Sequence, residues 1–434
     1  MNTFISKKLI LISLIFTLCP ISAQVKNTGI EKNWGPRHNR ATISPSLVHL
    51  ELSEKQGFKT VMVATRLMAA DVPKETNWAV NDIPGGNPTI GIIDKNGVYT
   101  APTSIPSPRE IHICAEVPEA VNRFLFATVI IGEEEPKYKP IHIWSEKKDD
   151  PDARMSGPHG IGLDQEGNIL IADRGSSSVL RYSTTGDFID RIDDGSGSKP
   201  GEVNEPREVT SDVEGRIFVT DSKGDRPRVQ VWNHKGEFQK IFAEKGRWQG
   251  MLLRAHGMDF DHLRRLFVVD VDNMAVKVYD KNGTSLFDWG EEGLAKGQFN
   301  APHGLFVDRA GDVFVTGYYG PTQKFSPEGD FITDFGYGDP PDGAVYFHSV
   351  SGDKWGNAYL SVRSKGGYDG AMEGLGEGKH LSIMKFNNNG SFITSWAYSA
   401  IEHSESEVAI TDDGIVYGLF IGPNDVGVET FVQE

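Results

Sequence analysis

Cysteine and positive charge are both scarce in this sequence. The 434 residues include only 2 cysteines, and 44 Lys and Arg face 60 Asp and Glu, for a net charge of −16. This charge repels the phosphates of nucleic acids and of anionic membranes, so we expect no nucleic-acid partner. Beyond the first 23 residues no apolar run is long enough to span a bilayer, so we expect no transmembrane segment.

Residues 1–23 have the pattern of a secretory signal peptide. Two lysines precede an apolar run, and Ala23 provides a small residue for cleavage. Cys19 lies inside this segment, and the leucine before it disfavours lipidation. Cleavage leaves one cysteine, Cys114, which excludes an intramolecular disulfide. We therefore expect a secreted protein, periplasmic or extracellular, whose stability comes from packing or metal binding.

Short alternating β runs fill residues 42–134, after a polar linker over residues 24–41. Examples are TVMVA at residues 60–64 and IHICA at residues 111–115, separated by turns rich in Pro, Gly and Asn. This pattern predicts a small β-sandwich. The segment GIIDKNGVYTAP at residues 91–102 resembles bacterial immunoglobulin-like modules, which implies an immunoglobulin-like domain.

From residue 137 onward the sequence is repetitive. One position recurs at spacings of 48, 49, 47 and 45 residues, and its occupants, called here the column residues, are His159, Arg207, His256, His303 and His348. Such a period with several β runs per unit predicts a β-propeller. The last unit lacks an outer strand, which we expect residues 140–144 to supply, closing the ring. The sequence therefore predicts an all-β protein with a six-bladed propeller over residues 137–434.

The column residues are predicted to surround the channel axis at one mouth, because the first strand of each blade lines the channel. Several converging neutral imidazoles suit zinc or a similar transition metal. His159, His256 and His348 come from alternate blades and are the predicted ligands. His303 is a fourth ligand, a base beside the metal, or a substrate-binding group. Alternatively, the histidines are shared repeat residues that cap the channel through hydrogen bonds.

The repeat segments resemble the NHL family, and the mouth is similar to that of the peptidyl-α-hydroxyglycine α-amidating lyases, six-bladed propellers in which three histidines hold zinc. The resemblance implies that Tyr318 acts as a general base and that Arg363 binds a substrate carboxylate. Lys223 stands where the family has an arginine, so the cation is kept without the bidentate fork. The resemblance also implies a structural calcium, but Gly160 follows His159 where the family has an aspartate near that ion.

Three further side chains complete the predicted site. Arg174 is a catalytic candidate beyond the family's set, and Arg207 and Tyr319 are expected to bind substrate. Alternatively, Arg174 and Arg363 form ion pairs between blades with the aspartates that end the strands. Tyr318 and Tyr319 would then serve for packing or ligand stacking at the mouth. A glycine-rich insertion at residues 366–380 is either a lid or a surface loop.

Three functions remain open. The first is a secreted metal-dependent lyase or hydrolase of a small anionic substrate. The second is a carbohydrate-active enzyme that acts on uronate-containing polysaccharide. The third is a binding propeller without catalysis. We expect a monomer whose partner is a small molecule or an oligosaccharide.

Overall fold

The computed structural model describes residues 40–63, 72–145, 152–222, 227–243, 245–318, 320–336, 345–364, 382–399, 405–421 and 426–434. In these segments the regular elements are β-strands, and the described chain contains no helix that could cross a membrane. The predicted signal peptide, nearly all of the linker, Lys223, Tyr319 and the insertion at 366–380 lie outside the described residues.

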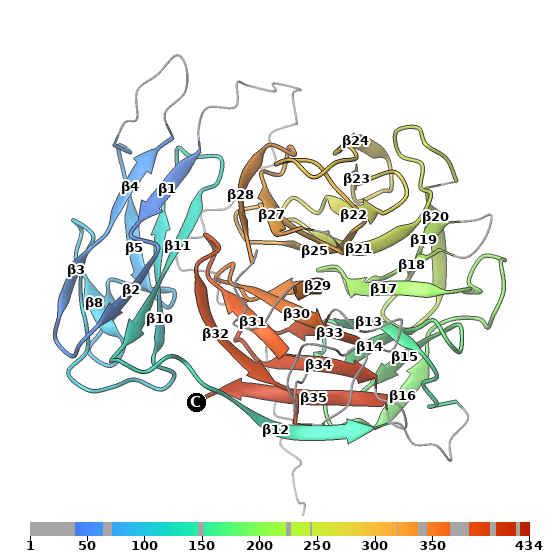
Figure 1. The fold of residues 1–434 in the computed structure, drawn as a ribbon, viewed down its shortest axis with the longest axis horizontal. Helices are drawn as coiled ribbons and strands as arrows, with labels where there is room; N and C mark the ends of the chain where they lie inside the picture. Colours follow the sequence, from blue (N-terminus) through green and yellow to red (C-terminus); the bar gives the residue numbers. More distant parts are fainter. Residues whose placement is uncertain are drawn as a thin grey trace, which may run out of the picture.

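The N-terminal unit consists of three β-sheets (Figure 1). The first contains, in spatial order, β2 (Leu47–Leu50), β11 (Phe124–Ile131), β10 (Glu110–Glu116), β5 (Asn77–Val80) and β6 (Ile83–Pro84). The second contains β3 (Lys55–Gly57), β9 (Val98–Thr100), β8 (Gly91–Ile93) and β7 (Gly86–Asn87). The third pairs β1 (Ala41–Ser44) with β4 (Lys59–Met62). Apolar side chains such as Tyr99, Ile113 and Val129 are fully buried in one common core, because each alternating strand presents one face to it.

Six further four-stranded sheets, called blades 1 to 6, make up the rest of the described chain. From the channel outward, blade 1 contains β13 (Pro158–Leu163), β14 (Ile169–Asp173), β15 (Ser178–Tyr182) and β16 (Phe188–Arg191). Blade 2 contains β17 (Pro206–Ser211), β18 (Ile217–Asp221), β19 (Arg228–Trp232) and β20 (Phe238–Phe242). Blade 3 contains β21 (Ala255–Phe260), β22 (Leu266–Asp270), β23 (Ala275–Tyr279) and β24 (Ser285–Trp289). Blade 4 contains β25 (Pro302–Val307), β26 (Val313–Gly317), β27 (Thr322–Phe325) and β28 (Phe331–Phe335). Blade 5 contains β29 (Val345–Gly352), β30 (Ala358–Ser364), β31 (Ser382–Phe386) and β32 (Phe392–Ala397). Blade 6 contains β33 (Glu405–Ile410), β34 (Val416–Ile421), β35 (Val426–Gln433) and β12 (Tyr138–Ser145).

The blades form a closed ring. Each innermost strand contacts the innermost strand of the next blade, and β33 returns to contact β13 (Figure 1). Strand β12, which includes the segment expected to close the ring, pairs antiparallel with β35 from Tyr138 opposite Gln433 to Ser145 opposite Gly427. Burial follows the sequence pattern: the apolar strand β14 is buried along its length, whereas the amphipathic outer strand β16 alternates.

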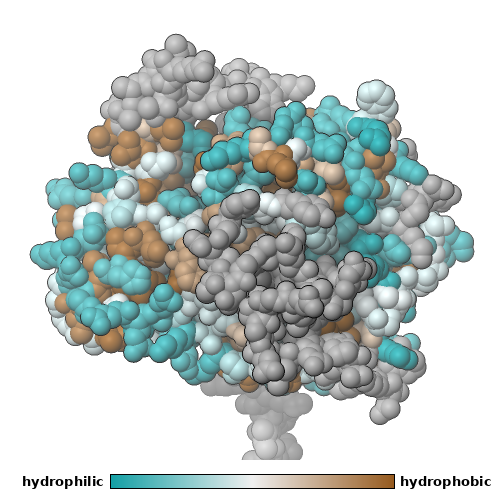
Figure 2. Space-filling model, viewed as in Figure 1, coloured by the Kyte–Doolittle hydropathy of each residue, from teal (hydrophilic) through white to brown (hydrophobic). Residues whose placement is uncertain are grey.

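The N-terminal unit packs against the propeller through a buried ion pair. Lys385 Nζ in β31 lies 2.7 and 2.8 Å from the two carboxylate oxygens of Glu110, and both side chains are almost fully buried. Trp355 stacks on His112 with ring centroids 4.7 Å apart. Trp355 lies three residues beyond the end of β29 at Gly352. In the view of Figure 2, hydrophobic residues are more frequent over the N-terminal unit than over the propeller.

Candidate metal centre at the channel mouth

A β-bulge near the start of each innermost strand of blades 1 to 5 positions the column residue. In blade 1 the pairing of β13 with β14 passes from Pro158 directly to Gly160, which leaves His159 without a partner in the ladder. The same irregularity occurs at the other four column residues, Arg207, His256, His303 and His348. A bulge bends its strand and redirects the side chain that it carries. This local feature brings side chains from separate blades together at the mouth.

Glycine follows His159 and His303 because neighbouring atoms leave no room for a Cβ at the next position. A Cβ on Gly160 would lie 2.5 Å from the carbonyl oxygen of Arg207 in the next blade. A Cβ on Gly304 would lie 2.7 Å from Thr316 Oγ1 and 2.9 Å from the backbone nitrogen of Val350. Since real Cβ atoms do not approach backbone atoms so closely, these positions require glycine. The repeated Pro-His-Gly segment thus combines a side chain for the mouth with a close strand contact.

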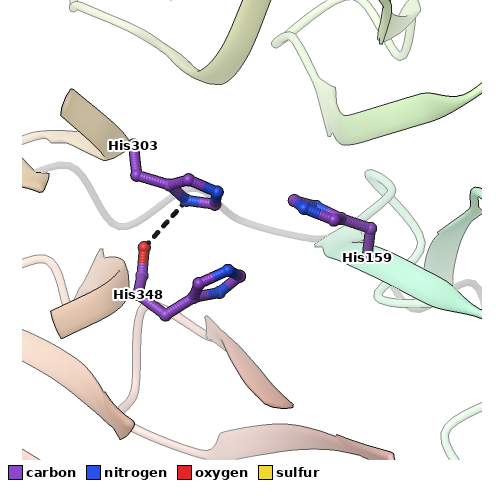
Figure 3. Close-up of side chains that lie close together, drawn as sticks. All are labelled: His159, His303 and His348. Carbon is purple, nitrogen blue, oxygen red and sulfur yellow. Dashed lines mark hydrogen bonds between the residues drawn. The ribbon is translucent and has the colours of Figure 1, made fainter. Parts of the chain in front are cut away.

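Three of the histidines gather most tightly (Figure 3). One ligand atom from each of His159, His303 and His348 lies within 4.8 Å of the other two, and all three residues are buried. Among the described residues, this is the one group of three His, Cys, Asp or Glu side chains close enough to hold a metal ion. The sequence favoured His256 as a ligand and left His303 uncertain, whereas the structure places His303 in the tightest group.

His256 lies against this trio. Its ring centroid is 4.3 Å from that of His303 and 5.3 Å from that of His159. Its Nδ1 atom is buried and has no hydrogen-bond partner among the described residues. A role for His256 as a further ligand stays a prediction.

The hydrogen bonds of the trio orient the rings for metal binding. His159 Nδ1 lies 3.0 Å from the carbonyl oxygen of Arg207, and His303 Nδ1 lies 3.0 Å from the carbonyl oxygen of His348 (Figure 3). A carbonyl only accepts, so Nδ1 carries the proton in both rings and Nε2 keeps its lone pair. His303 Nε2 is buried and lacks a partner within the described part of the chain. Such an orphaned acceptor fits a metal ligand, because a buried polar atom without a partner is costly.

Glu407 supports the third ring. Its Oε1 atom lies 2.5 Å from His348 Nδ1, and both side chains are almost fully buried. The two atoms are in close contact, although they are not aligned as a hydrogen bond. A carboxylate behind a histidine fixes the ring and strengthens the opposite nitrogen as a ligand. Glu407 therefore belongs to the site, although the sequence did not single it out.

Three of the column histidines favour the neutral form of the imidazole. Burial holds the pKa values of His159, His256 and His303 well below the ordinary value of 6.5. The Arg207 guanidinium lowers the pKa of His159 further, and crowding among imidazoles that would repel one another if protonated lowers the pKa values of His159 and His303. Neutral rings are the form that binds metal. Tetrahedral zinc at 2.0–2.1 Å needs ligand nitrogens about 3.3 Å apart, so binding would draw the trio inward.

Two other carboxyl groups lie on the innermost strands. Glu208 follows Arg207 in blade 2 as Glu407 follows Ser406 in blade 6. Burial raises the pKa of Glu208 well above its usual range, and Glu407 raises it further. Burial also raises the pKa of Asp259 to about 7. These groups keep protons at pH values where carboxyl groups are ordinarily ionised.

Tyr318 lies beside the trio, at the end of β26. Its ring centroid is 4.9 Å from that of His303 and 5.8 Å from that of His348. Its backbone N–H donates to the carbonyl of Ala301 at 3.1 Å, which holds the residue at the mouth. The structure thus brings the predicted base to the predicted metal site.

Arginines occupy the side of the mouth formed by blades 1 to 3. Arg207 Nη2 lies 3.3 Å from Glu205, and Arg254 Nη2 lies 2.8 Å from Asp272. Arg174 has no ion pair with a described residue, and the expected strand-end partner, Asp173, instead accepts N–H groups of its own loop. Sequence reasoning missed Arg254, which precedes His256 by two residues. Arg363 lies in β30, opposite Tyr346, and its side chain is outside the described part.

Comparisons with known proteins agree with the fold. No protein-family model matches the chain. The chain is 29% identical over 114 residues to protein brain tumor of Drosophila melanogaster, covering 25% of this chain and 11% of that protein. It is 26% identical over 167 residues to NHL repeat-containing protein 3 of Mus musculus, covering 35% of this chain and 48% of that protein. The chain therefore spans less than half the length of each of these relatives.

One solved structure is similar over nearly the whole chain. A structural genomics protein of unknown function from Bacteroides thetaiotaomicron is similar over 94% of this chain and 100% of its own, with a TM-score of 0.51 and 12% identity. A streptogramin B lyase is similar over 69% of this chain and 98% of its own, with a TM-score of 0.44 and 12% identity. Together with the repeat and the ring of four-stranded sheets, the local matches to the two relatives support an NHL-type β-propeller fold for this chain.

Proposed function

We propose that the protein is a metal-dependent enzyme, of lyase or hydrolase type, that acts on a small anionic substrate at the histidine mouth. The observation that carries the proposal is the buried trio His159, His303 and His348, with ligand atoms within 4.8 Å of one another. Nitrogen ligands suit zinc or a similar transition metal, whereas calcium prefers oxygen ligands. A calcium site stays a prediction.

The chain's own groups have distinct roles in this proposal. Zinc bound to the trio would lower the pKa of a hydroxyl or water that it holds. The carbonyls of Arg207 and His348 keep Nε2 of two rings free to bind it. Tyr318, beside His303, would accept the proton of the substrate hydroxyl once its own phenol is ionised, the role that the amidating-lyase resemblance implies. Arginine side chains at the mouth would bind the substrate's negative charge.

We further infer the finer architecture and location. Six four-stranded sheets support a six-bladed propeller, and the two larger N-terminal sheets around one core support an immunoglobulin-like sandwich. We also propose that the chain is secreted by its N-terminal signal and acts as a monomer. N-terminal sequencing of the exported protein should begin at Gln24, and light scattering should give the mass of one copy.

Metal analysis tests the proposed function. The purified protein should contain about one equivalent of zinc by mass spectrometry of the metal, the stoichiometry of a single site. His303→Ala should lose it, and the control His234→Ala, at an exposed turn, should not. Retention of the metal by His303→Ala would contradict the trio, and His256→Ala tests whether that ring is also a ligand.

Product analysis then separates the three functions. The zinc-loaded protein would be screened against α-hydroxyglycine conjugates and uronate oligosaccharides. Release of glyoxylate would support the lyase reading, and an unsaturated or shortened sugar would support the carbohydrate-active alternative. Binding of these compounds without any product would indicate a propeller that is not catalytic.

A further inference from the structure

Three arginines lie together on one side of the histidine mouth. Arg174 directly follows β14, Arg207 is the column residue of β17, and Arg254 directly precedes β21. They belong to three consecutive blades. The backbone of Arg207 is fixed to the metal centre, because its carbonyl accepts the hydrogen bond from His159.

The donors of these arginines are incompletely used. The Nε atoms of Arg207 and Arg254 are buried and have no hydrogen-bond partner among the described residues. Among the described residues, one carboxylate reaches each of these two guanidinium groups, Glu205 for Arg207 and Asp272 for Arg254. A guanidinium offers five N–H donors, so a single carboxylate leaves most of them without an acceptor. Arg174 has no acceptor within the described part of the chain.

The aspartates nearest in sequence do not neutralise this charge. Asp173 accepts the backbone N–H groups of Ser156 and Gly157, and Asp270 accepts those of Leu253 and Arg254. Asp221, at the equivalent position in blade 2, pairs instead with Arg228. The strand-end carboxylates are therefore already occupied by their own loops and blades.

Positive charge is thus concentrated at one place in a protein of net charge −16. Burial lowers the pKa of Arg207, and the charges of Arg174 and Arg254 lower it further, whereas Glu205 opposes the shift. Like charges held this close and partly out of water repel one another unless an anion lies among them.

We propose that Arg174, Arg207 and Arg254 form an oxyanion-binding subsite beside the histidines, which takes a carboxylate, phosphate or sulfate group. The unpaired buried Nε atoms and the fork of the guanidinium match two oxygens of one group. The inference rests on the proposed function in one respect, that the anion is part of the substrate. It places the charged end of that substrate over blades 1 to 3 and the reacting group toward Tyr318.

Anion titration tests the subsite without any reaction. Sodium phosphate, sulfate and acetate would each be titrated by calorimetry into the full-length protein stripped of metal, at low ionic strength. We expect binding of at least one anion that weakens as salt is added. Arg207→Gln and Arg174→Gln should each weaken it by about tenfold or more. The control is Arg265→Gln, which removes the same charge from a side chain that is paired with Asp261. Both residues lie beyond the end of β21 that is opposite His256. This variant should change anion binding less than about twofold.

The outcomes separate the two proposals. Absence of binding by all three anions would overturn the subsite, as would equal affinity in Arg174→Gln, Arg207→Gln and the parent protein. Arg174 has no partner in the described structure, so its variant should keep the parent's circular dichroism even if Arg207→Gln does not fold. Anion binding to protein that never acquires zinc would sustain the subsite while the metal proposal fails. If the protein binds zinc but the arginine variants bind anions as tightly as the parent, the metal proposal would stand and the subsite would fail.

Discussion

Replacing Glu407 with glutamine should weaken metal binding without disturbing the fold. Glu407 Oε1 lies 2.5 Å from His348 Nδ1, with both side chains out of contact with bulk water. The negative charge of the carboxylate therefore polarises the His348 ring and increases the electron density on its Nε2 atom, although the contact is not aligned as a hydrogen bond. An amide of the same shape keeps the packing and loses the negative charge.

The expected loss follows from this contact. Carboxylates behind metal-binding histidines are typically worth 10- to 100-fold in metal affinity, which is about 1.4–2.7 kcal/mol. Water does not screen the contact, because His348 and Glu407 are both buried. We therefore expect the zinc dissociation constant of Glu407→Gln to rise by that factor, measured by competition with a chromophoric chelator.

A matched carboxylate provides the control. Glu208 occupies the equivalent position in blade 2, but its Oε1 atom accepts the N–H of Val209 at 3.1 Å and has no described histidine partner. Its raised pKa already favours the neutral form, so Glu208→Gln should alter zinc affinity by less than about threefold. Equal affinities in Glu407→Gln and the parent protein, with unchanged thermal unfolding, would refute the role assigned to Glu407.

Three further predictions follow from the site. Tyr318→Phe should keep its zinc and slow the chemical step by about 10²–10⁴-fold in single-turnover assays, because a positioned base is lost; an unchanged rate would exclude Tyr318 as the base. Gly304→Ala should lower the free energy of unfolding by about 1–3 kcal/mol, because its Cβ meets Thr316 and Val350. Urea titration measures this loss, and Gly57→Ala is the control because its Cβ would enter open space. The pKa of Asp259 is raised from 3.8 to about 7. Between these pH values the folded state keeps a proton that the unfolded state has lost. The free energy of unfolding should therefore fall as pH rises from about 4 to about 7 and then level off. The side chain is only partly buried, so we expect a change of about 1–2 kcal/mol, absent in Asp259→Asn; a flat profile in the parent protein would contradict the raised pKa.

The architecture was predictable because the sequence repeats itself. The spacing of the column residues sets the blade length, and the missing outer strand of the last unit pointed to residues 140–144, which lie in β12. The docking of the N-terminal unit was not predictable. Glu110 and Lys385 are 275 positions apart, and neither lies in a pattern that indicates the other.

The site was predictable at the level of the column and not at the level of individual contacts. Aligning the repeats brings His159, His303 and His348 to one mouth, but the tightest group depends on bulge geometry and ring rotation. Glu407 was missed because the column position of blade 6 is Ser406, so no histidine pattern draws attention to its neighbour. Arg254 lies two residues before its column residue, a position at which the other repeats have no second cation for comparison.

The pairing of β12 with β35 has a consequence for how the protein is made. Synthesis produces β12 before every blade and β35 after every other strand, yet Tyr138 pairs with Gln433 in the native ring. Ring closure must therefore wait until the whole propeller has been synthesised, and it is among the contacts of longest sequence separation. Such contacts form slowly, and until then β12 presents an unpaired edge to other chains. We expect the refolding rate to be limited by ring closure, and incomplete chains that lack β35 to aggregate through β12.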